Sequence, residues 1–473
     1  MPVNRRQFIA GAGAALSAST ALVPATVARA ASHGADAPEG WSTLRAAVAK
    51  AQLAPGDYPP TEVWAYNESS PGPVLRFNRG EMLRQRLVND LPEETSVHWH
   101  GIRLPNAMDG VPDLTQKAVA TGETFDYEFA VPDAGTYWYH THNRSWEQMA
   151  RGLYGPLIID EDTPPDVDRD LILTVDDWRL DQTTAEIAGA FGNLMDFAHG
   201  GRMGNLITVN SQFEHRQPVK GGERLRLRLI NTATARIFSL GLQGLEGWVV
   251  AVDGQPLDTP TPPEEVFRLA PAQRIDLIVD VTAEPGQEAY VIGIERSGGF
   301  ALATFDVATG TAAARRPAPA ALPSNDLPAP DRANAREAPL LLEGGAMRGL
   351  GKAMFEGRSL SGRELSEQGQ VWAMNGVAGM PSVPLAGVAR GETLRIPFQN
   401  DTMFPHAMHL HGHHFREELA DGTLGPWRDT ILVDPDQKTS IVFVADNPGR
   451  WLLHCHMLGH QASGMKTRIE VST

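Results

Sequence analysis

Four motifs of this 473-residue chain each hold two histidines separated by a residue that can occupy a regular strand. The four motifs are His98-Trp99-His100, His140-Thr141-His142, His409-Leu410-His411 and His454-Cys455-His456. In a β-strand, residues i and i+2 share one face, so each motif presents two imidazoles side by side. Imidazole binds zinc, copper, iron and nickel, so four such pairs indicate a metal site without naming the metal.

The last motif carries a second set of ligand types. Cys455 is the single cysteine of the chain; His460 and Met465 follow it, and His406 precedes it. Two imidazoles, one thiolate and a weak thioether are the ligands of a blue-copper electron-transfer centre, whereas zinc prefers four strong tetrahedral ligands. Because side chains alternate along a strand, Cys455 faces away from the two histidines that flank it. The sequence therefore predicts one copper on one side of this strand and a polynuclear site on the other.

A threefold repeat positions these motifs. A Gly-Glu turn followed by alternating apolar and polar residues starts at Gly80, Gly222 and Gly391, and this alternation is typical of a half-buried strand. The first motif begins 18 residues after Gly80 (98 − 80), and the third begins 18 residues after Gly391 (409 − 391). The same count from Gly222 reaches Leu240, and two further residues reach Leu242. The repeat itself therefore does not require histidine at these positions.

These patterns predict an all-β protein built from three β-sandwich domains. Helical periodicity is confined to a short stretch, Leu44–Leu53. The proline- and alanine-rich stretch Thr311–Pro330 predicts an extended surface linker. The predicted division is a domain over 50–162, a domain without copper ligands over 167–310, a linker over 311–336 and a domain over 337–473.

The first thirty residues are typical of an export signal. Asn4-Arg5-Arg6-Gln7-Phe8 resembles the twin-arginine motif, and Ala28-Arg29-Ala30 is a small-x-small cleavage site. We therefore expect export by the twin-arginine machinery to the periplasm, with cleavage near Ala30. No other segment offers about 18 uninterrupted apolar residues, so no membrane span is expected. Lys+Arg 41 against Asp+Glu 57 gives a net charge of −16, which disfavours nucleic acids and anionic membranes as partners.

Taken together, the motifs resemble the signature of the multicopper oxidases: HWHG at 98, HTH at 140, HAMHLHG at 406 and HCHMLGHQASGM at 454. The resemblance covers about residues 55–473 and is greatest to three-domain bacterial enzymes of the laccase and copper-resistance type. It implies cupredoxin-like Greek-key domains and four copper ions, one of type 1, one of type 2 and two of type 3. The implied ligands are His406, Cys455, His460 and axial Met465 for type 1, His98 and His409 for type 2, and His100, His140, His142, His411, His454 and His456 for type 3.

The activity that this resemblance implies is one-electron oxidation of a phenol, an aromatic amine or cuprous ion, coupled to four-electron reduction of dioxygen to water. One alternative is a periplasmic resistance protein that sequesters copper without significant turnover, and another is an exported structural protein whose sites have decayed. The complete type 1 set favours the oxidase, because storage needs no electron relay. A copper nitrite reductase would need only two cupredoxin modules and no pair at His140 and His142.

Two positions near the motifs are candidates for supplying protons to the trinuclear site. Asp109 follows His98 by 11 residues (109 − 98). At this position, similar oxidases have an acid that assists protonation at the trinuclear site. The alternative for Asp109 is a simple turn residue before Gly110. Gln461 stands where many relatives have a glutamate in the proton path, and an amide cannot shuttle protons as a carboxylate does.

Several further residues are left with two interpretations. Met403 with Asp401 could dock a cuprous ion, but a core methionine and a turn aspartate are favoured. Relatives usually have proline after the histidine at position 406, whereas here Pro405 precedes it and Ala407 follows. The sequence therefore does not determine the geometry of this loop. Met195 and Met203 with His199, and separately Met347 and Met354, could make further soft-metal contacts, but methionine as adaptable filler is the favoured interpretation. His413 and His414 exceed the ligand count and are interpreted as residues behind the ligands or at the surface.

Overall fold

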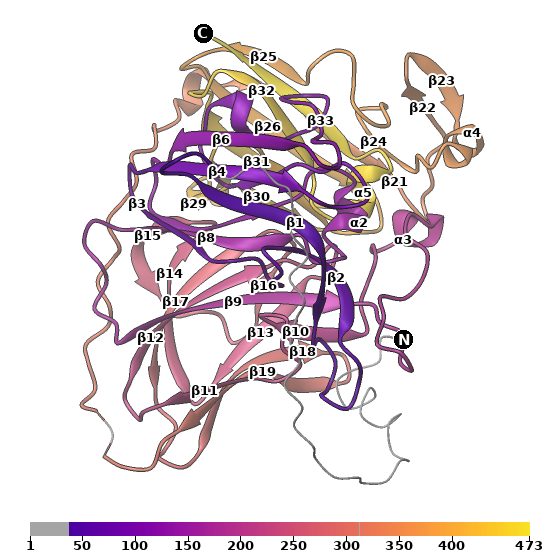
Figure 1. Ribbon diagram of the computed structural model, residues 1–473. Helices are drawn as coiled ribbons and strands as arrows, with labels where there is room; N and C mark the ends of the chain where they lie inside the picture. The colour runs from indigo at the N-terminus through magenta and orange to yellow at the C-terminus, as the bar shows by residue number, and fades with distance from the viewer. Residues whose placement is uncertain (1–36, 312) are drawn as a thin grey trace.

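Strands are the main regular elements of the computed structural model, which describes residues 37–311 and 313–473 (Figure 1). Strands account for 47% and helix for 6%. The predicted all-β fold is therefore confirmed, while the predicted export signal lies outside the described residues. Within those residues, no helix has the length and apolar character needed to cross a membrane.

The first sandwich carries the first two histidine motifs. One sheet has the order β2 (Thr61–Tyr66), β1 (Ser42–Ala51), β4 (Met82–Asn89) and β6 (Thr124–Ala130), and the other has β3 (Leu75–Asn78), β8 (Tyr154–Asp160), β7 (Gly135–His140) and β5 (His98–His100). Leu83, Trp99 and Tyr137 belong to the apolar core between the sheets. Strand β5 pairs antiparallel with β7, which puts His98 opposite His140.

The second sandwich contains none of the four motifs. Its six-stranded sheet has the order β10 (Leu206–Val209), β9 (Arg169–Trp178), β12 (Arg224–Asn231), β17 (Arg274–Val281), β14 (Leu245–Val252) and β15 (Gln255–Thr261). Its five-stranded sheet has the order β11 (His215–Val219), β19 (Gly298–Val307), β18 (Glu288–Glu295), β13 (Phe238–Gln243) and β16 (Phe267–Leu269). Leu240, which stands where the other repeats have histidine, packs in the apolar core.

The third sandwich carries the last two motifs on neighbouring strands. One sheet has the order β24 (Trp372–Met374), β21 (Leu340–Gly344), β26 (Thr393–Asp401), β31 (Lys438–Val444), β28 (Phe415–Glu418) and β29 (Leu424–Arg428), with β20 (Arg336–Glu337) also pairing with β26. The other has β25 (Ala386–Ala389), β33 (Lys466–Ser472), β32 (Gly449–Cys455), β27 (His406–Leu410) and β30 (Thr430–Val433). Because β27 pairs antiparallel with β32, His409 lies opposite His454 and Met408 opposite Cys455.

The remaining elements are short. Strands β22 (Lys352–Phe355) and β23 (Arg358–Ser361) form a separate hairpin. The helices of the described chain lie in loops: η1 (Asn106–Met108), α2 (Ser145–Gln148), α3 (Leu194–Ala198), η2 (Arg332–Asn334), α4 (Gly362–Glu367) and α5 (Leu458–Ala462).

The Gly-Glu turn is built in the same way in all three sandwiches. Gly80, Gly222 and Gly391 have φ values of 79°, 72° and 92°, a backbone region that glycine enters without steric cost. In each copy the following glutamate accepts a hydrogen bond from the backbone N–H three residues before it, at 2.9, 2.7 and 2.6 Å. The sequence repeat therefore reflects one turn, used three times to start a central strand.

Two local expectations were wrong. Leu44–Leu53 is not helical, because its residues up to Ala51 form β1, which pairs antiparallel with β2 and parallel with β4. Strand β12 is not half-buried, because every one of its side chains is buried. Its polar face packs against the first sandwich and the linker, where Arg226 pairs with Glu161 and Arg224 donates to the carbonyl of Pro317. Tertiary contacts thus override the surface that an isolated alternating strand would have.

The segment between the second and third sandwiches has no helix or strand from residue 313 to 331, and it follows one side of the molecule (Figure 1). Most of its side chains are exposed, but Leu322 packs against Val250 and Ile278. Asn325 exchanges two hydrogen bonds with the backbone of Ala134, at 2.9 and 2.8 Å. The segment thus bridges the first two sandwiches as well as joining the second to the third.

Candidate metal centres

The eight histidines of the four motifs meet in one buried region between the first and third sandwiches. The rings of His98 and His411 are 4.0 Å apart between centroids, and those of His100 and His409 are stacked at 3.7 Å. Three groups have candidate ligand atoms within 4.8 Å of one another: His98, His100 and His409; His100, His140 and His456; and His142, His411 and His454. The structure therefore brings together all four predicted pairs, and every group combines residues of both sandwiches.

The ring nitrogens in this region divide into two classes. In three of the rings, those of His98, His140 and His409, Nδ1 donates to a backbone carbonyl at 2.8–2.9 Å, while Nε2 is buried and has no partner. His100 is the reverse, with Nδ1 unpartnered and Nε2 bonded to a carboxylate. Buried polar atoms without partners are costly and rare, and a hydrogen bond on one ring nitrogen presents the other to a metal. These rings fit bound metal ions.

Protonation favours the same interpretation. Burial and the neighbouring imidazoles hold the pKa of His140, His142 and His411 well below the usual histidine range. The rings are therefore neutral at ordinary pH, and neutral imidazole is the form that binds metal.

Asp109 lies against two rings from different sandwiches. Its carboxylate is fully buried and lies 3.0 Å from Nδ1 of His411 and 3.2 Å from Nδ1 of His98. The next residue, Gly110, has φ of 77°, and a Cβ there would lie 1.8 Å from the carbonyl oxygen of Val97. The turn that holds Asp109 in place thus requires glycine.

A second buried carboxylate, Asp429, contacts two other rings of the cluster, and no sequence pattern singled it out. Its Oδ1 accepts a hydrogen bond from Nε2 of His100 at 3.2 Å, and its backbone carbonyl accepts from Nδ1 of His409 at 2.9 Å. Burial opposes ionisation, but Arg274 and His100 outweigh it and hold the pKa of the Asp429 carboxyl well below its usual range. No motif marks Asp429, since its partners come from remote parts of the chain.

His406, Cys455 and His460 form a separate buried group. The Nδ1 atoms of the two histidines are 3.1 Å apart, and the Cys455 sulfur lies 3.6 and 3.7 Å from them. Met465 is buried and bonded through its backbone to Cys455 and His460, at 3.1 and 2.9 Å. Burial raises the pKa of the Cys455 thiol to about 12. A thiolate at this position needs a bound cation, which fits a metal held by these three side chains.

The outer nitrogens of this group are also occupied. His406 Nε2 lies 2.8 Å from the Thr402 hydroxyl, and His460 Nε2 donates to the backbone carbonyl of His199 at 2.6 Å. His199 follows α3, which belongs to the second sandwich and packs on α5. Trp372 lies over the His460 ring, with centroids 4.4 Å apart. The inner nitrogens alone are left to face the sulfur.

The changed proline position does not disturb this group. Ala407 lies within regular strand β27, paired with Leu432 of β30. Its carbonyl accepts the backbone N–H of His456 at 2.6 Å. Proline at position 405 is thus compatible with a strand that starts at His406.

Several residues that the sequence left open are now placed. Met403 is 45% exposed, so the core interpretation is wrong, and Asp401 next to it pairs with Arg348. The filler interpretation is wrong for four other methionines, because their side chains are exposed at the surface: Met195, Met203, Met347 and Met354 are 67%, 37%, 84% and 39% exposed. His199 packs its ring near Phe404, with centroids 6.0 Å apart.

His413 and His414 are buried rather than at the surface. Neither belongs to a group that could hold a metal. His414 Nε2 lies 3.2 Å from the side chain of Gln255, in the second sandwich. Gln461 is buried too, and its side-chain oxygen accepts the Ser145 hydroxyl at 3.2 Å.

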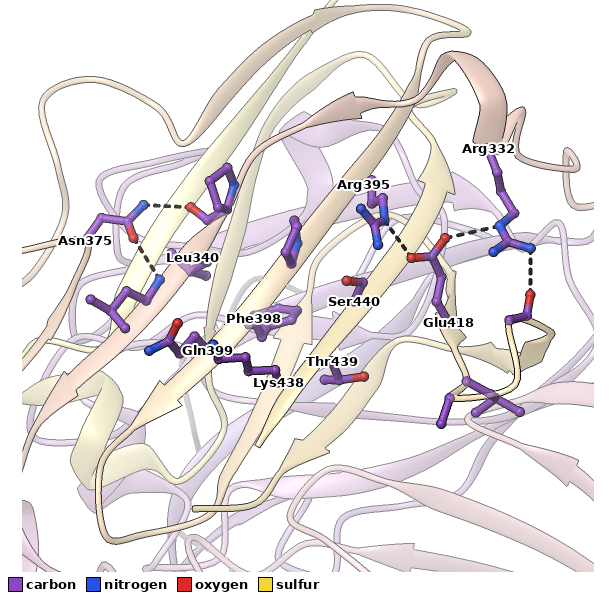
Figure 2. A pocket seen from close by; sticks show the side chains of 16 residues that line it. Arg332, Leu340, Asn375, Arg395, Phe398, Gln399, Glu418, Lys438, Thr439 and Ser440 are labelled. Atoms are coloured by element: carbon purple, nitrogen blue, oxygen red, sulfur yellow. Dashed lines mark hydrogen bonds and ion pairs between the residues drawn. The ribbon is translucent and has the colours of Figure 1, made fainter. Parts of the chain in front are cut away.

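A cavity of about 760 Å³ on the third sandwich is lined by none of the residues that form the candidate metal groups (Figure 2). Figure 2 shows Glu418 between Arg332 and Arg395, and it bonds to them at 3.1 and 2.6 Å. Glu418, the one carboxylate of the described residues that lines this cavity, is therefore already paired with two arginines.

Comparison with known proteins gives concordant results. Three family models, each described as multicopper oxidase, match residues 47–164, 170–316 and 360–473. The chain is 32% identical to multicopper oxidase MmcO of Mycobacterium tuberculosis, over 86% of this chain and 82% of that protein, and 28% identical to copper resistance protein A of Escherichia coli, over 86% and 88%. The crystal structure of Lac15 from a marine microbial metagenome matches with a TM-score of 0.74 and 43% identity, over 91% of this chain and all of that one. The multicopper oxidase from Pseudomonas thermotolerans matches with a TM-score of 0.79 and 32% identity, over 91% and 98%.

Proposed function

The chain belongs to the multicopper oxidase family and is a copper-dependent oxidoreductase that uses dioxygen, and we propose that it couples four one-electron oxidations of a small donor to the reduction of dioxygen to two waters. The observation that carries this proposal is the junction at β32. Cys455 belongs there to the group with His406 and His460, while the residues on either side of it, His454 and His456, belong to the larger cluster.

We assign four copper ions to these residues. Copper, when bound, takes up electrons singly from the donor and supplies them to dioxygen. The unpartnered ring nitrogens and the His₂Cys set support the assignment. The proposed ligands are His406, Cys455, His460 and Met465 for type 1, His98 and His409 for type 2, and His100, His140, His142, His411, His454 and His456 for the type 3 pair.

Asp109 has a proposed role in supplying protons. Reduction of dioxygen to water consumes four protons, and Asp109 is a buried carboxylate that lies against His98 and His411, one type 2 and one type 3 ligand. Gln461 cannot take this role, because a side-chain amide is neither an acid nor a base at ordinary pH. We therefore propose Asp109 as an acid that supplies protons to the reacting oxygen.

The donor is a small phenol, an aromatic amine or cuprous ion. The cuprous interpretation is supported by Met403, whose thioether is a soft ligand suited to Cu(I) and is exposed beside Asp401. Met403 precedes the type 1 ligand His406 by three residues, so an ion held there is near the electron acceptor. We propose Met403 and Asp401 as a weak docking site for that donor.

Periplasmic export is also part of the proposal. The Arg5-Arg6 motif and the cleavage site ending at Ala30 support passage through the twin-arginine machinery. The division into domains over 50–162, 167–310 and 337–473, with a linker over 311–336, stays a prediction.

Oxygen consumption by the copper-loaded protein tests the function. With a phenol or cuprous ion as donor, the wild-type protein should be intensely blue and should consume one dioxygen for every four donor molecules. The sequestration alternative predicts bound copper without sustained oxygen uptake. Cys455→Ser serves as the control, because it removes the thiolate and leaves all eight cluster histidines in place.

A further inference from the structure

Arg274 of the second sandwich pairs with Asp429, the residue that contacts His100 and His409 of the histidine cluster. It is the first residue of β17 and is fully buried. Its guanidinium group forms two parallel hydrogen bonds with Asp429 of the third sandwich, Nη1 to Oδ1 at 2.9 Å and Nη2 to Oδ2 at 2.6 Å. This fork matches the planar geometry of guanidinium and carboxylate, which a lysine cannot reproduce.

Arg274 is bonded to all three sandwiches. Its Nε donates to the carbonyl of Thr136 at 3.1 Å, on strand β7 of the first sandwich, which ends at His140. Its backbone N–H donates to Asp253 of its own sandwich at 3.0 Å. The other oxygen of Asp253 accepts the backbone N–H of Thr430, the residue after Asp429, at 3.3 Å. The seam between the sandwiches is therefore fixed at the point where Arg274 lies.

Asp429 transmits this position to two rings. It accepts from His100 through Oδ1 and from His409 through its carbonyl, and the Thr430 hydroxyl donates to Oδ1 at 2.8 Å. These bonds occupy Nε2 of His100 and Nδ1 of His409. The unpartnered atoms are then Nδ1 of His100 and Nε2 of His409, which lie in one group with His98.

The backbone after the His98–His100 motif leaves room for the ion pair between Arg274 and Asp429. Gly101 follows His100 and has φ of 86°. A Cβ at Gly101 would lie 2.5 Å from Nη2 of Arg274 and 2.6 Å from Oδ2 of Asp429. Any side chain there would displace the ion pair.

We infer that Arg274 is a positioning residue for the trinuclear copper site: by holding Asp429 in one orientation it fixes which nitrogens His100 and His409 present to copper. The inference rests on the proposed function, since it concerns the same site. It gives the second sandwich, which has no ligands of its own, a direct part in building the centre. Without the guanidinium, a buried carboxylate loses its charged partner and both rings lose a fixed acceptor.

The test compares Arg274→Met with Arg274→Lys in the copper-loaded full-length protein. We expect Arg274→Met to keep the blue absorption of the Cys455 site, which has no contact with Arg274. Its type 2 electron paramagnetic resonance signal should be lost or changed in hyperfine splitting, and oxygen consumption should fall about 10- to 100-fold. Arg274→Lys keeps the charge without the fork, so its signal should be intermediate.

Arg226→Met is the matched control. Arg226 is also buried and also pairs with carboxylates, Glu161 across the seam to the first sandwich and Asp276 within its own sandwich, but neither carboxylate contacts a histidine of the cluster in the described chain. Its type 2 signal should equal that of the wild type. An unchanged type 2 signal in Arg274→Met, or the same change in Arg226→Met, overturns the inference.

Failure of the proposed function can be distinguished from failure of the role of Arg274. If Arg274→Met does not fold, Asp429→Asn takes its place, because it keeps the shape of the side chain and removes the charge; an unchanged type 2 signal there overturns the inference as well. If the wild-type protein itself shows neither blue absorption nor oxygen uptake, the proposed function fails. If the wild type is active and Arg274→Met equals it, only the role of Arg274 fails.

Discussion

Cys455 and His456 are consecutive residues whose side chains belong to two different metal-binding groups. The Cys455 sulfur lies 3.6 Å from His406 Nδ1, whereas His456 joins His100 and His140. The His456 backbone N–H donates to Ala407, the neighbour of His406, so the two groups are also linked by a hydrogen bond between strands. In the proposed function, an electron collected at the Cys455 group therefore has a covalent path to the larger cluster through two adjacent residues.

Cys455→Ser is expected to remove the blue absorption and the oxygen consumption, while the copper of the larger cluster remains. A hydroxyl is a poor substitute for thiolate as a copper ligand, and no cluster histidine is altered. Absorption spectra and copper content per chain check this. A blue, active serine variant would contradict the whole assignment.

Asp109→Asn is expected to lower the rate of oxygen reduction about 10- to 100-fold and to leave the blue absorption unchanged. The amide keeps the contacts to His98 and His411 in part but supplies no proton. Reoxidation of the fully reduced protein, followed at the blue band, measures this step directly. Wild-type reoxidation kinetics would leave Asp109 with only a structural role.

Met403→Leu is expected to lower kcat/KM for cuprous ion about tenfold, which corresponds to about 1.4 kcal/mol, with little effect on a phenol. Leucine keeps the apolar volume and removes the soft sulfur. Steady-state oxygen uptake with both donors provides the comparison. Met195→Leu, at another exposed methionine, is the control; equal effects on both donors would argue against docking at Met403.

The copper-free protein is expected to lose stability as the pH falls from 7 to 5. Burial lowers the pKa of His414 to about 4, so in this range the unfolded chain binds a proton that the folded chain does not. His414→Asn should reduce this loss of unfolding free energy by about 2 kcal/mol. Urea unfolding at the two pH values checks this, and identical losses in both proteins would exclude a contribution from His414.

The histidine motifs could be predicted because their information is local. Side chains alternate along a strand with a period of two residues, which places the two histidines of each motif on one face. The equal distance from the Gly-Glu turns of Gly80 and Gly391 places two of the motifs at equivalent positions. The missing histidines at Leu240 and Leu242 indicated that the pairs serve chemistry rather than folding.

The supporting residues could not be predicted in this way. Arg274 and Asp429 are 155 residues apart and meet only because two sandwiches pack together. Alternation in β12 predicted an exposed polar face, but that face is covered by other parts of the chain. The exposure of Met403 and the burial of His414 likewise depend on packing that no local pattern records.

The arginines of β12 have a consequence for how the molecule can change. Arg224, Arg226 and Arg228 are each at most 2% exposed, and their acceptors include Pro317 of the linker, and Glu161 and Thr136 of the first sandwich. Deleting the second sandwich would leave Glu161 without its arginine partner. Isolating the second sandwich would expose three guanidinium groups that have lost acceptors in the first sandwich and the linker. The second sandwich and its neighbours therefore stabilise one another. We expect the whole chain to melt in a single calorimetric transition.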